Sequence, residues 1–384
     1  MIHSKANMQA KRIYLDYAAT SPILPEVIDY ISEIAKTIFG NPSSTHAEGR
    51  IAKSFLEEHR KTISSLLKCN SSELFFTSCG TESNNLILKS SVSTLGVKRI
   101  ISSPIEHSCN LQCFKWLQKE YKTQVDFLKV NEFGQIDLEE LESLLHDNSQ
   151  KTLVSLMHVN NELGTMLNLE ETGHICRKHH ALFHTDTVQG IGFFPYNFSE
   201  LPIDFASGSA HKFYAPKSCG FAYINNQNIL EPLLHGGSQE RSVRAGTENL
   251  IGIGAMSKAL SYCYADLENR MTHLEQLNLQ LRSLLSKQFP DILINSPWHA
   301  SSPKILNVQF PYFEGIELLT IKLDIEGLSV SGGSACASGA ETASHVISQI
   351  RPDHPGKAIR FSFSHLTNSE EIERCVSILA KVIH

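Results

Sequence analysis

A lysine follows an expected strand, beside a hydroxyl and an imidazole, in Ser209-Ala210-His211-Lys212. The amine of Lys212 could form an imine with an aldehyde, while Ser209 and His211 could donate hydrogen bonds to phosphate oxygens. The segment therefore suits a phosphorylated aldehyde. Taken alone, the more common interpretation is an exposed surface lysine.

A carboxylate and a carboxamide follow another apolar run, in His184-Thr185-Asp186-Thr187-Val188-Gln189. Open α/β sheets bind ligands at the carboxyl ends of their strands. Asp186 could there keep a pyridine nitrogen protonated, so that the ring acts as an electron sink, and Gln189 could reach a ring hydroxyl. The alternative is an aspartate that caps the next helix.

The segment 75–83, Phe-Phe-Thr-Ser-Cys-Gly-Thr-Glu-Ser, is typical of a strand, a turn of small residues and a helix start. The backbone N–H groups of Gly80 and Thr81, together with the helix dipole, would suit a phosphate. The alternative is an ordinary turn capped by Thr81 or Ser78. The segment has neither the ending of a Walker A loop nor the spacing of a dinucleotide fingerprint.

His107 follows a further expected strand and could stack on a flat cofactor and exchange protons. Because the chain has 18 histidines, a single one is more often structural or solvated. Four other residues mimic a metal site: His174, Cys176, His179 and His180. No Cys-x-x-Cys or His-Glu-x-x-His pattern supports a metal there, so we predict none.

One cysteine, Cys336, lies among ten small residues at 331–340, Ser-Gly-Gly-Ser-Ala-Cys-Ala-Ser-Gly-Ala. A thiol on such a loop, which we expect to be mobile, could visit a buried site and carry a group away. The alternative is an inert cysteine. Arg360, 24 residues later, could clamp a carboxylate with two hydrogen bonds or form a structural ion pair.

The framework that would position these residues is predicted to be α/β, with a largely parallel sheet, because strand-like runs alternate with amphipathic helical patterns. We expect strands at 73–77, 99–103, 124–128, 152–158, 182–186, 205–209 and 221–224, and helices at 50–67, 81–89, 109–121, 138–145 and 169–179.

A helical stretch from about residue 250 to 285 is longer than an ordinary helix, so we expect a bend or domain crossover near its middle. The segments beyond it are typical of a smaller α+β unit. We therefore predict a large domain at 16–265 and a small domain formed by 1–15 and 266–384.

Composition narrows the class of protein. Of 384 residues, 41% are hydrophobic and 19% are charged, which excludes disorder of the whole chain. A net charge of −6 argues against a nucleic-acid-binding surface that covers the protein. No transmembrane run or secretory signal is visible, and nine scattered cysteines are typical of a reducing compartment, so we expect a cytoplasmic protein.

The order and spacing of these segments resemble the cysteine desulfurases of the iron–sulfur and nitrogenase type. These belong to the class V aminotransferase group of fold-type I enzymes, which use pyridoxal 5'-phosphate (PLP). The resemblance runs from Tyr14-Leu15-Asp16-Tyr17-Ala18-Ala19-Thr20 to the expected strand of Arg360, and includes Gly40–His46, His158–Gly164 and Arg244–Thr247. The stretch around Cys336 resembles the group with the longer mobile loop.

The resemblance implies a fold with a large, mainly parallel-sheet domain and a smaller α+β domain. It also implies that Lys212 binds PLP covalently and moves protons, with His107 stacked on the ring. The implied cofactor ligands are Gly80, Thr81, His107, Asn161, Asp186, Gln189, Ser209, His211, Lys212 and, from a second subunit, Thr247. The implied substrate ligands are Asn41, Asn161 and Arg360.

The implied reaction converts L-cysteine to L-alanine, with the sulfur left as a persulfide on Cys336. The partners would be a second copy of the chain and a sulfur-acceptor protein, either an iron–sulfur scaffold or a thiolation enzyme, with a transient iron–sulfur contact through Cys336 and no direct nucleic-acid or membrane partner. Two alternatives are a related aminotransferase or selenocysteine lyase that does not use Cys336, and a non-catalytic PLP-binding accessory protein.

The chain departs from the family pattern at several positions. Cys79 and Ala210 stand where relatives carry glycine, and Ser364-His365 replaces a pair that ends in arginine. The chain also ends soon after its last expected helix, which leaves the acceptor open.

Overall fold

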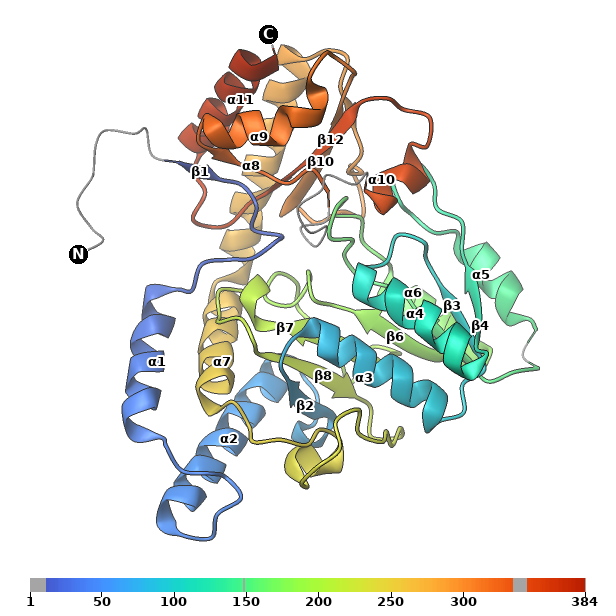
Figure 1. The fold of residues 1–384 in the computed structure, drawn as a ribbon, viewed down its shortest axis with the longest axis vertical. Coiled ribbons are helices and arrows are strands. Elements are labelled where there is room, and N and C mark those ends of the chain that lie inside the picture. Colours follow the sequence, from blue (N-terminus) through green and yellow to red (C-terminus); the bar gives the residue numbers. More distant parts are fainter. Residues whose placement is uncertain (1–11, 148, 334–343, 384) are drawn as a thin grey trace.

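A seven-stranded sheet forms the centre of the larger part of the molecule (Figure 1). The computed structural model describes residues 12–147, 149–333 and 344–383. The strands follow the order β2 (Leu74–Thr77), β8 (Gly220–Ile224), β7 (Phe205–Ser209), β6 (Leu182–Asp186), β5 (Thr152–Ser155), β3 (Arg99–Ser102) and β4 (Gln124–Phe127). β8 is antiparallel to both of its neighbours, and the other pairs are parallel.

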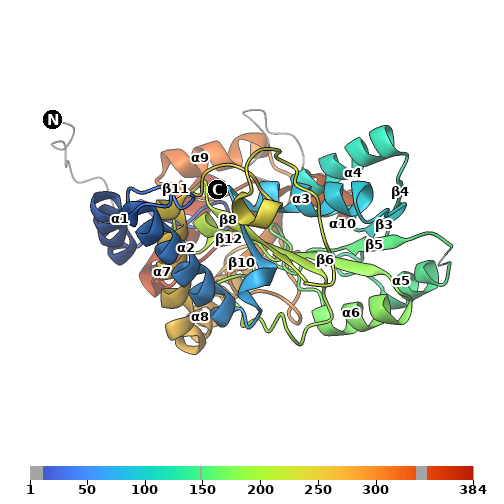
Figure 2. The ribbon, with the colours of Figure 1, turned by 90° about the horizontal axis from the view of Figure 1, so that it is seen from below.

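Helices cover both faces of this sheet. Figure 2 shows α3 (Gly80–Ser93) and α4 (Ser108–Tyr121) on one face, and α5 (Leu138–Leu145) and α6 (Leu169–Lys178) on the other. This cover explains why β2, β3, β5, β7 and β8 are buried along their whole length, as parallel and mixed sheets between helices require. The predicted alternation of strands and helices is therefore confirmed.

Three further helices pack together beside the sheet: α1 (Pro25–Thr37), α2 (Ala47–Leu66) and α7 (Leu250–Ala265). No helix is predicted from the sequence at α1. Its start is nevertheless typical, because Pro25 occupies the first turn, where a missing N–H costs nothing. Val27 and Ile34 form its buried face.

The smaller part contains a three-stranded antiparallel sheet, in the order β12 (Lys357–Ser362), β10 (Ile305–Phe310) and β9 (Leu293–Ile294). Its helices are α8 (Leu267–Gln288), α9 (Leu319–Ile325), α10 (His345–Ile350) and α11 (Ser369–Ile383). The first strand, β1 (Ile13–Tyr14), pairs in parallel with β11 (Leu328–Ser329) and so returns the amino-terminal segment to this part.

The long helical stretch is broken, as predicted. α7 ends at Ala265 and α8 begins at Leu267, and Asp266 between them has φ −135° and ψ 43°. The predicted domain boundary lies at this break, and the division itself stays a prediction. Across the described ranges, no helix combines the length and apolar character needed to cross a membrane.

Candidate active site

A cavity of about 190 Å³ lies beside the carboxyl ends of β6 and β7. Ten of the predicted site residues line it: Gly80, Thr81, His107, Asn161, Asp186, Gln189, Ser209, His211, Lys212 and Arg360. They come from segments spread over 280 positions of sequence. The position agrees with the rule that open α/β sheets bind ligands at the carboxyl ends of their strands.

Lys212 ends a short 3-10 helix, Ala210–Lys212, that directly follows β7. Ala210 is fully buried, and its N–H donates to the carbonyl oxygen of Cys219, which fixes the start of this turn. The Nζ atom of Lys212 donates to the carbonyl oxygens of Ala18 and Ala19, at 2.7 and 2.8 Å. The amine is therefore held in the cavity by the segment that follows β1.

Asp186 ends β6 and is almost completely buried. Its Oδ2 accepts a hydrogen bond from Nδ2 of Asn84 at 2.7 Å, and its Oδ1 accepts from the N–H of Val188 at 3.0 Å. Asn84 lies on the buried face of α3 and lines the cavity, although the sequence analysis does not identify it. These two donors fix the direction of the carboxylate.

His107 caps the amino terminus of α4. Its Nδ1 accepts from the backbone N–H of Cys109 at 3.2 Å, and the thiol of Cys109 lies 3.0 Å from the same nitrogen. Burial, and to a lesser degree Lys212, lowers the pKa of His107, against the opposing effect of Asp186, so the neutral imidazole is favoured. Burial raises the pKa of Cys109 to about 12, so this second unpredicted residue of the cavity stays a thiol.

The amino terminus of α3 forms another wall. Gly80 begins this 14-residue helix, and a Cβ atom there would lie 2.6 Å from Cγ2 of Val188. Glycine therefore allows the close packing of the turn. His211 contacts the hydroxyl of Thr20 at 3.1 Å, and burial with neighbouring lysines lowers its pKa to about 4, so it can donate a hydrogen bond as a neutral ring.

Arg360 is a buried residue of β12, from the smaller part of the molecule. Its Nη1 donates to the carbonyl oxygen of Asn161 at 2.8 Å, and its Nη2 pairs with Asp16 at 2.7 Å. Its Nε has no hydrogen-bond partner within the described ranges. The arginine thus forms an ion pair with Asp16 and also lines the cavity, and its role as a clamp for a substrate carboxylate stays a prediction.

Two predicted site residues that the structure describes do not line the cavity. Asn41 and Thr247 are exposed and lie outside its lining. Cys336 lies outside the residues that the structure describes.

The cavity residues fit PLP by their chemistry. A helix amino terminus with Ser209 and a neutral His211 suits a phosphate, the carboxylate of Asp186 suits a pyridinium nitrogen, and the amine of Lys212 suits an aldehyde. The neutral imidazole of His107, which also lines the cavity, suits stacking on the flat ring of the cofactor. The structure brings these groups together in one cavity. The sequence patterns predict each motif separately and do not show that the motifs meet.

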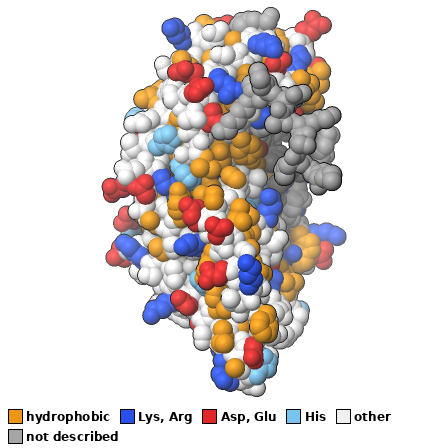
Figure 3. All heavy atoms as spheres, turned by 90° about the vertical axis from the view of Figure 1, so that its left-hand side faces the viewer, with side chains coloured by type: hydrophobic (Ala, Val, Ile, Leu, Met, Phe, Trp, Pro, Cys, Tyr) orange, Lys and Arg blue, Asp and Glu red, His pale blue; other side chains and the backbone are white. Residues whose placement is uncertain are grey.

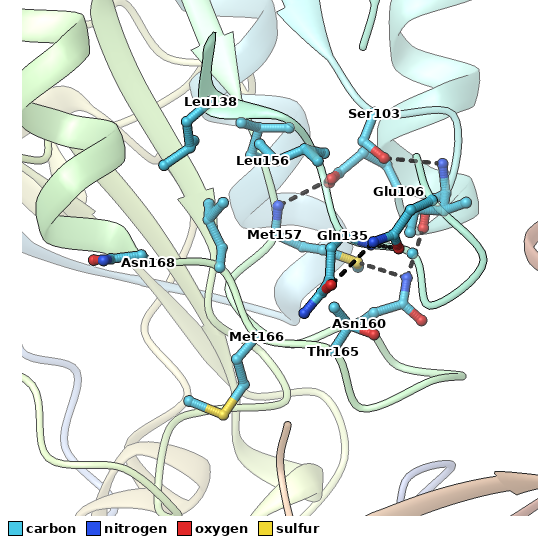
Figure 4. A pocket seen from close by; sticks show the side chains of 15 residues that line it. Ser103, Glu106, Gln135, Leu138, Leu156, Met157, Asn160, Thr165, Met166 and Asn168 are labelled. Atoms are coloured by element: carbon cyan, nitrogen blue, oxygen red, sulfur yellow. Dashed lines mark hydrogen bonds between the residues drawn. The ribbon is translucent and has the colours of Figure 1, made fainter. Parts of the chain in front are cut away.

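A second cavity shares the lining residue Met157 with the first. Figure 4 shows Glu106 there, with one carboxylate oxygen directed at the backbone of Met157. The two oxygens of Glu106 accept from the N–H of Met157 at 2.9 Å and from Nδ2 of Asn110 at 3.2 Å. Glu106 thereby joins the loop after β3, which carries His107, to the end of β5.

The fold and the cavity define an enzyme of the PLP-dependent class. The family model "Aminotransferase class-V" matches residues 13–375, so the chain belongs to the class V aminotransferase family. The predicted family, fold and cofactor are confirmed.

Among curated proteins, the chain is 38% identical to "Cysteine desulfurase IscS" of Dictyoglomus turgidum, over 97% of this chain and 95% of that protein. Among solved structures, a NifS-like protein matches with a TM-score of 0.89 and 34% identity, over 97% of this chain and 99% of the other. The structure of SspA in complex with cysteine matches with a TM-score of 0.81 and 28% identity, over 93% of this chain and all of the other.

Proposed function

We propose that this protein is a PLP-dependent cysteine desulfurase, which converts L-cysteine to L-alanine and passes the sulfur on through Cys336. The observation that carries the proposal is the meeting of Lys212, Asp186 and Arg360 in one cavity. A lysine amine and a buried carboxylate suit the two ends of PLP, and a buried guanidinium suits an amino-acid carboxylate.

Bound PLP supplies an electron sink that makes the Cα proton of the amino acid acidic. Asp186 holds the proton on the ring nitrogen, and Asn84 fixes the direction of its carboxylate. Lys212 carries the proton to and from Cα, and the neutral imidazole of His107 lies beside it to share this transfer. Arg360 binds the carboxylate of the substrate.

Cys336 completes the proposed reaction. Its thiolate attacks the sulfur of the bound cysteine, so that an S–S bond forms while the C–S bond breaks. The electron pair of the broken bond stays with carbon, which gains a proton and leaves as alanine. One thiol and one cysteine thus give one persulfide and one alanine.

Purified protein given L-cysteine and a reductant should release alanine and sulfide in equal amounts. Cys336→Ser should abolish both while the cofactor still binds, and Cys69→Ser, which alters a partly buried thiol outside the cavity, should abolish neither. Alanine formation that survives in Cys336→Ser would favour the lyase or aminotransferase alternative. A wild-type protein that takes up no PLP would favour the accessory alternative.

We also propose a homodimer in which Thr247 reaches the phosphate site of the neighbour. Thr247 is exposed and lies outside its own cavity. The helices α1 and α2 and the loop between them expose the apolar side chains of Ile28, Phe39 and Ile51. Figure 3 shows hydrophobic side chains gathered on the side of the molecule where α1 lies.

Mixed subunits test this arrangement. Lys212→Ala and Thr247→Ala proteins should each be weak or inactive, whereas a heterodimer of the two should regain activity at the one site that has both native residues. Light scattering should give twice the chain mass. No recovery on mixing, in heterodimers verified by two affinity tags, would contradict the action of Thr247 across the interface.

The proposal also covers the sulfur acceptor and the cellular compartment. We propose a cytoplasmic enzyme with a protein as sulfur acceptor, because a persulfide carrier needs reduced thiols. All eight cysteines of the described residues are free. Sulfur-labelled L-cysteine should transfer its label to one acceptor protein, either a cluster scaffold or a thiolation enzyme, and Cys336→Ser should prevent this transfer.

A further inference from the structure

Lys304 is a lysine without an exposed surface, only 1% accessible, that directly precedes β10. Its Nζ lies 3.4 Å from Oε1 of Gln189 and 3.5 Å from the carbonyl oxygen of Lys212. The same nitrogen lies 3.8 Å from the centre of the Phe193 ring. Within the described ranges no carboxylate forms an ion pair with Lys304.

An amine in such a place is unfavourable for folding, because a buried polar group loses its hydration and a buried charge loses more. An apolar side chain of similar length would avoid this loss. Burial, and secondly the charge of Lys212, also lowers the pKa of Lys304 well below its ordinary value, which favours the uncharged amine. Even uncharged, the amine retains N–H groups that can donate.

The amine of Lys304 can fix the orientation of the Gln189 carboxamide. A carboxamide has an accepting oxygen and two N–H groups, and its two ends can exchange places by rotation. Nε2 donates one N–H to the carbonyl oxygen of Ala18 at 2.9 Å, and Oε1 receives the donor of Lys304. Both contacts favour one orientation of the carboxamide. Because Gln189 lines the cavity, its second N–H group can then donate a hydrogen bond to a ligand.

We propose that Lys304 is a positioning residue for the cofactor: it locks the carboxamide of Gln189 so that Nε2, rather than Oε1, faces the ring oxygen of PLP. This inference rests on the proposed function, because it requires PLP in the cavity. Without the donor at Oε1, only the contact of Nε2 with Ala18 opposes rotation of the carboxamide. In the rotated orientation its oxygen would meet the oxygen of the ring, and the two would repel each other.

The test is a double-mutant cycle on cofactor binding with Lys304→Met, Gln189→Leu and the two combined. The dissociation constant of PLP is measured by titrating the cofactor-free proteins. Methionine retains the length and removes the donor. We expect Lys304→Met alone to weaken binding about fivefold, as loss of one hydrogen bond would. The double variant should bind no more weakly than Gln189→Leu alone, because the lysine acts through the glutamine.

Stability measurements separate positioning from packing. The melting temperature of cofactor-free Lys304→Met should equal or exceed that of the wild type. Arg282→Met is the matched control, because Arg282 is another buried cation, one that donates to the carbonyl oxygens of Ser296 and Pro297 away from the cavity. It should alter stability and leave PLP affinity unchanged.

Unchanged PLP affinity in Lys304→Met, or losses that add in the double variant, would overturn the inference. If Lys304→Met does not fold, Lys304→Gln and Lys304→Leu replace it, and only the glutamine, which retains an N–H donor, should bind PLP nearly as well as the wild type. A wild-type protein that takes up no PLP would refute the proposed function itself. A wild type that binds PLP, with no effect of Lys304→Met, would refute only the role of Lys304.

Discussion

The guanidinium of Arg360 and the carboxylate of Asp16 lie 2.7 Å apart, although 344 positions separate the two residues. The pair joins β12 of the smaller part to the segment that follows β1. With Nη1 held by the carbonyl oxygen of Asn161, two nitrogens of Arg360 have fixed partners. The side chain is therefore oriented before a substrate arrives, which is what efficient carboxylate recognition requires.

Asp16→Asn should raise the KM for L-cysteine about tenfold with a smaller effect on kcat, because a guanidinium that is free to turn binds a carboxylate less well. Steady-state alanine formation measures both constants. Asp324→Asn is the control, because Asp324 pairs with Arg12 on the same amino-terminal segment at the surface. A fall in kcat at constant KM would contradict the positioning of Arg360 by Asp16.

Asn84→Ala should weaken PLP binding by about tenfold or more, because hydrogen bonds to charged groups contribute about 1.5–3 kcal/mol. Asn85→Ala alters the next residue, whose amide donates to the carbonyl oxygen of Thr81, and should bind PLP as the wild type does. Equilibrium titration of the cofactor-free proteins distinguishes the two. Equal affinities would show that Asp186 keeps its direction without Asn84.

Glu106 should make the protein less stable as the pH rises. Burial raises its pKa from 4.5 to about 8, so the folded protein binds one more proton than the unfolded chain between these values. This contribution is fully present below pH 4.5 and is lost as the pH rises through about 8. The buried His158 has the opposite slope, but only between its folded pKa of about 4 and 6.5.

In the pH range from 6.5 to 8.5 the buried Lys304, whose pKa is lowered by burial, contributes the opposite slope, so the contribution of Glu106 is the difference between the wild type and Glu106→Gln. Over this range the free energy of unfolding should fall in the wild type more than in Glu106→Gln, whose side chain does not titrate. Urea denaturation at the two pH values measures the difference. Parallel changes in the two proteins would mean that Glu106 is ionised at neutral pH.

Glu240→Ala should cost about 3 kcal/mol of unfolding free energy, because it leaves the guanidinium of Arg60 buried without its main partner. The two side chains lie 2.7 Å apart and each is only 2% exposed. Glu142→Ala, which breaks a surface pair with Lys178, should cost much less, because water screens exposed charges. Urea denaturation compares the two, and equal losses would contradict the importance of the buried pair.

Local patterns predict the framework well. The bounds of β6 and β7 agree with the expected strands, and each strand ends at a predicted polar site residue, Asp186 or Ser209. The helix α1 is not predicted, although Val27, Ile31 and Ile34 repeat with helical spacing and form one apolar face that packs on the core.

The site is predicted only as far as each motif has a local signature. Asn84 has none, because a polar residue on a helix indicates a surface until the structure shows that its partner is Asp186. Asp16 is likewise joined to Arg360 only by the fold. Asn41 and Thr247 follow from the resemblance alone, and both lie outside the cavity of their own chain.

The return of the amino-terminal segment has a consequence for biosynthesis. Ile13 pairs with Leu328, and the nearby Ala18 gives its carbonyl oxygen to both Lys212 and Gln189. The ribosome makes this segment well before its partner strand, which exists only after more than 300 further residues have been added. Because contacts so distant in sequence form late, we expect this wall of the cavity to close, and PLP to bind, only after β11 has been made.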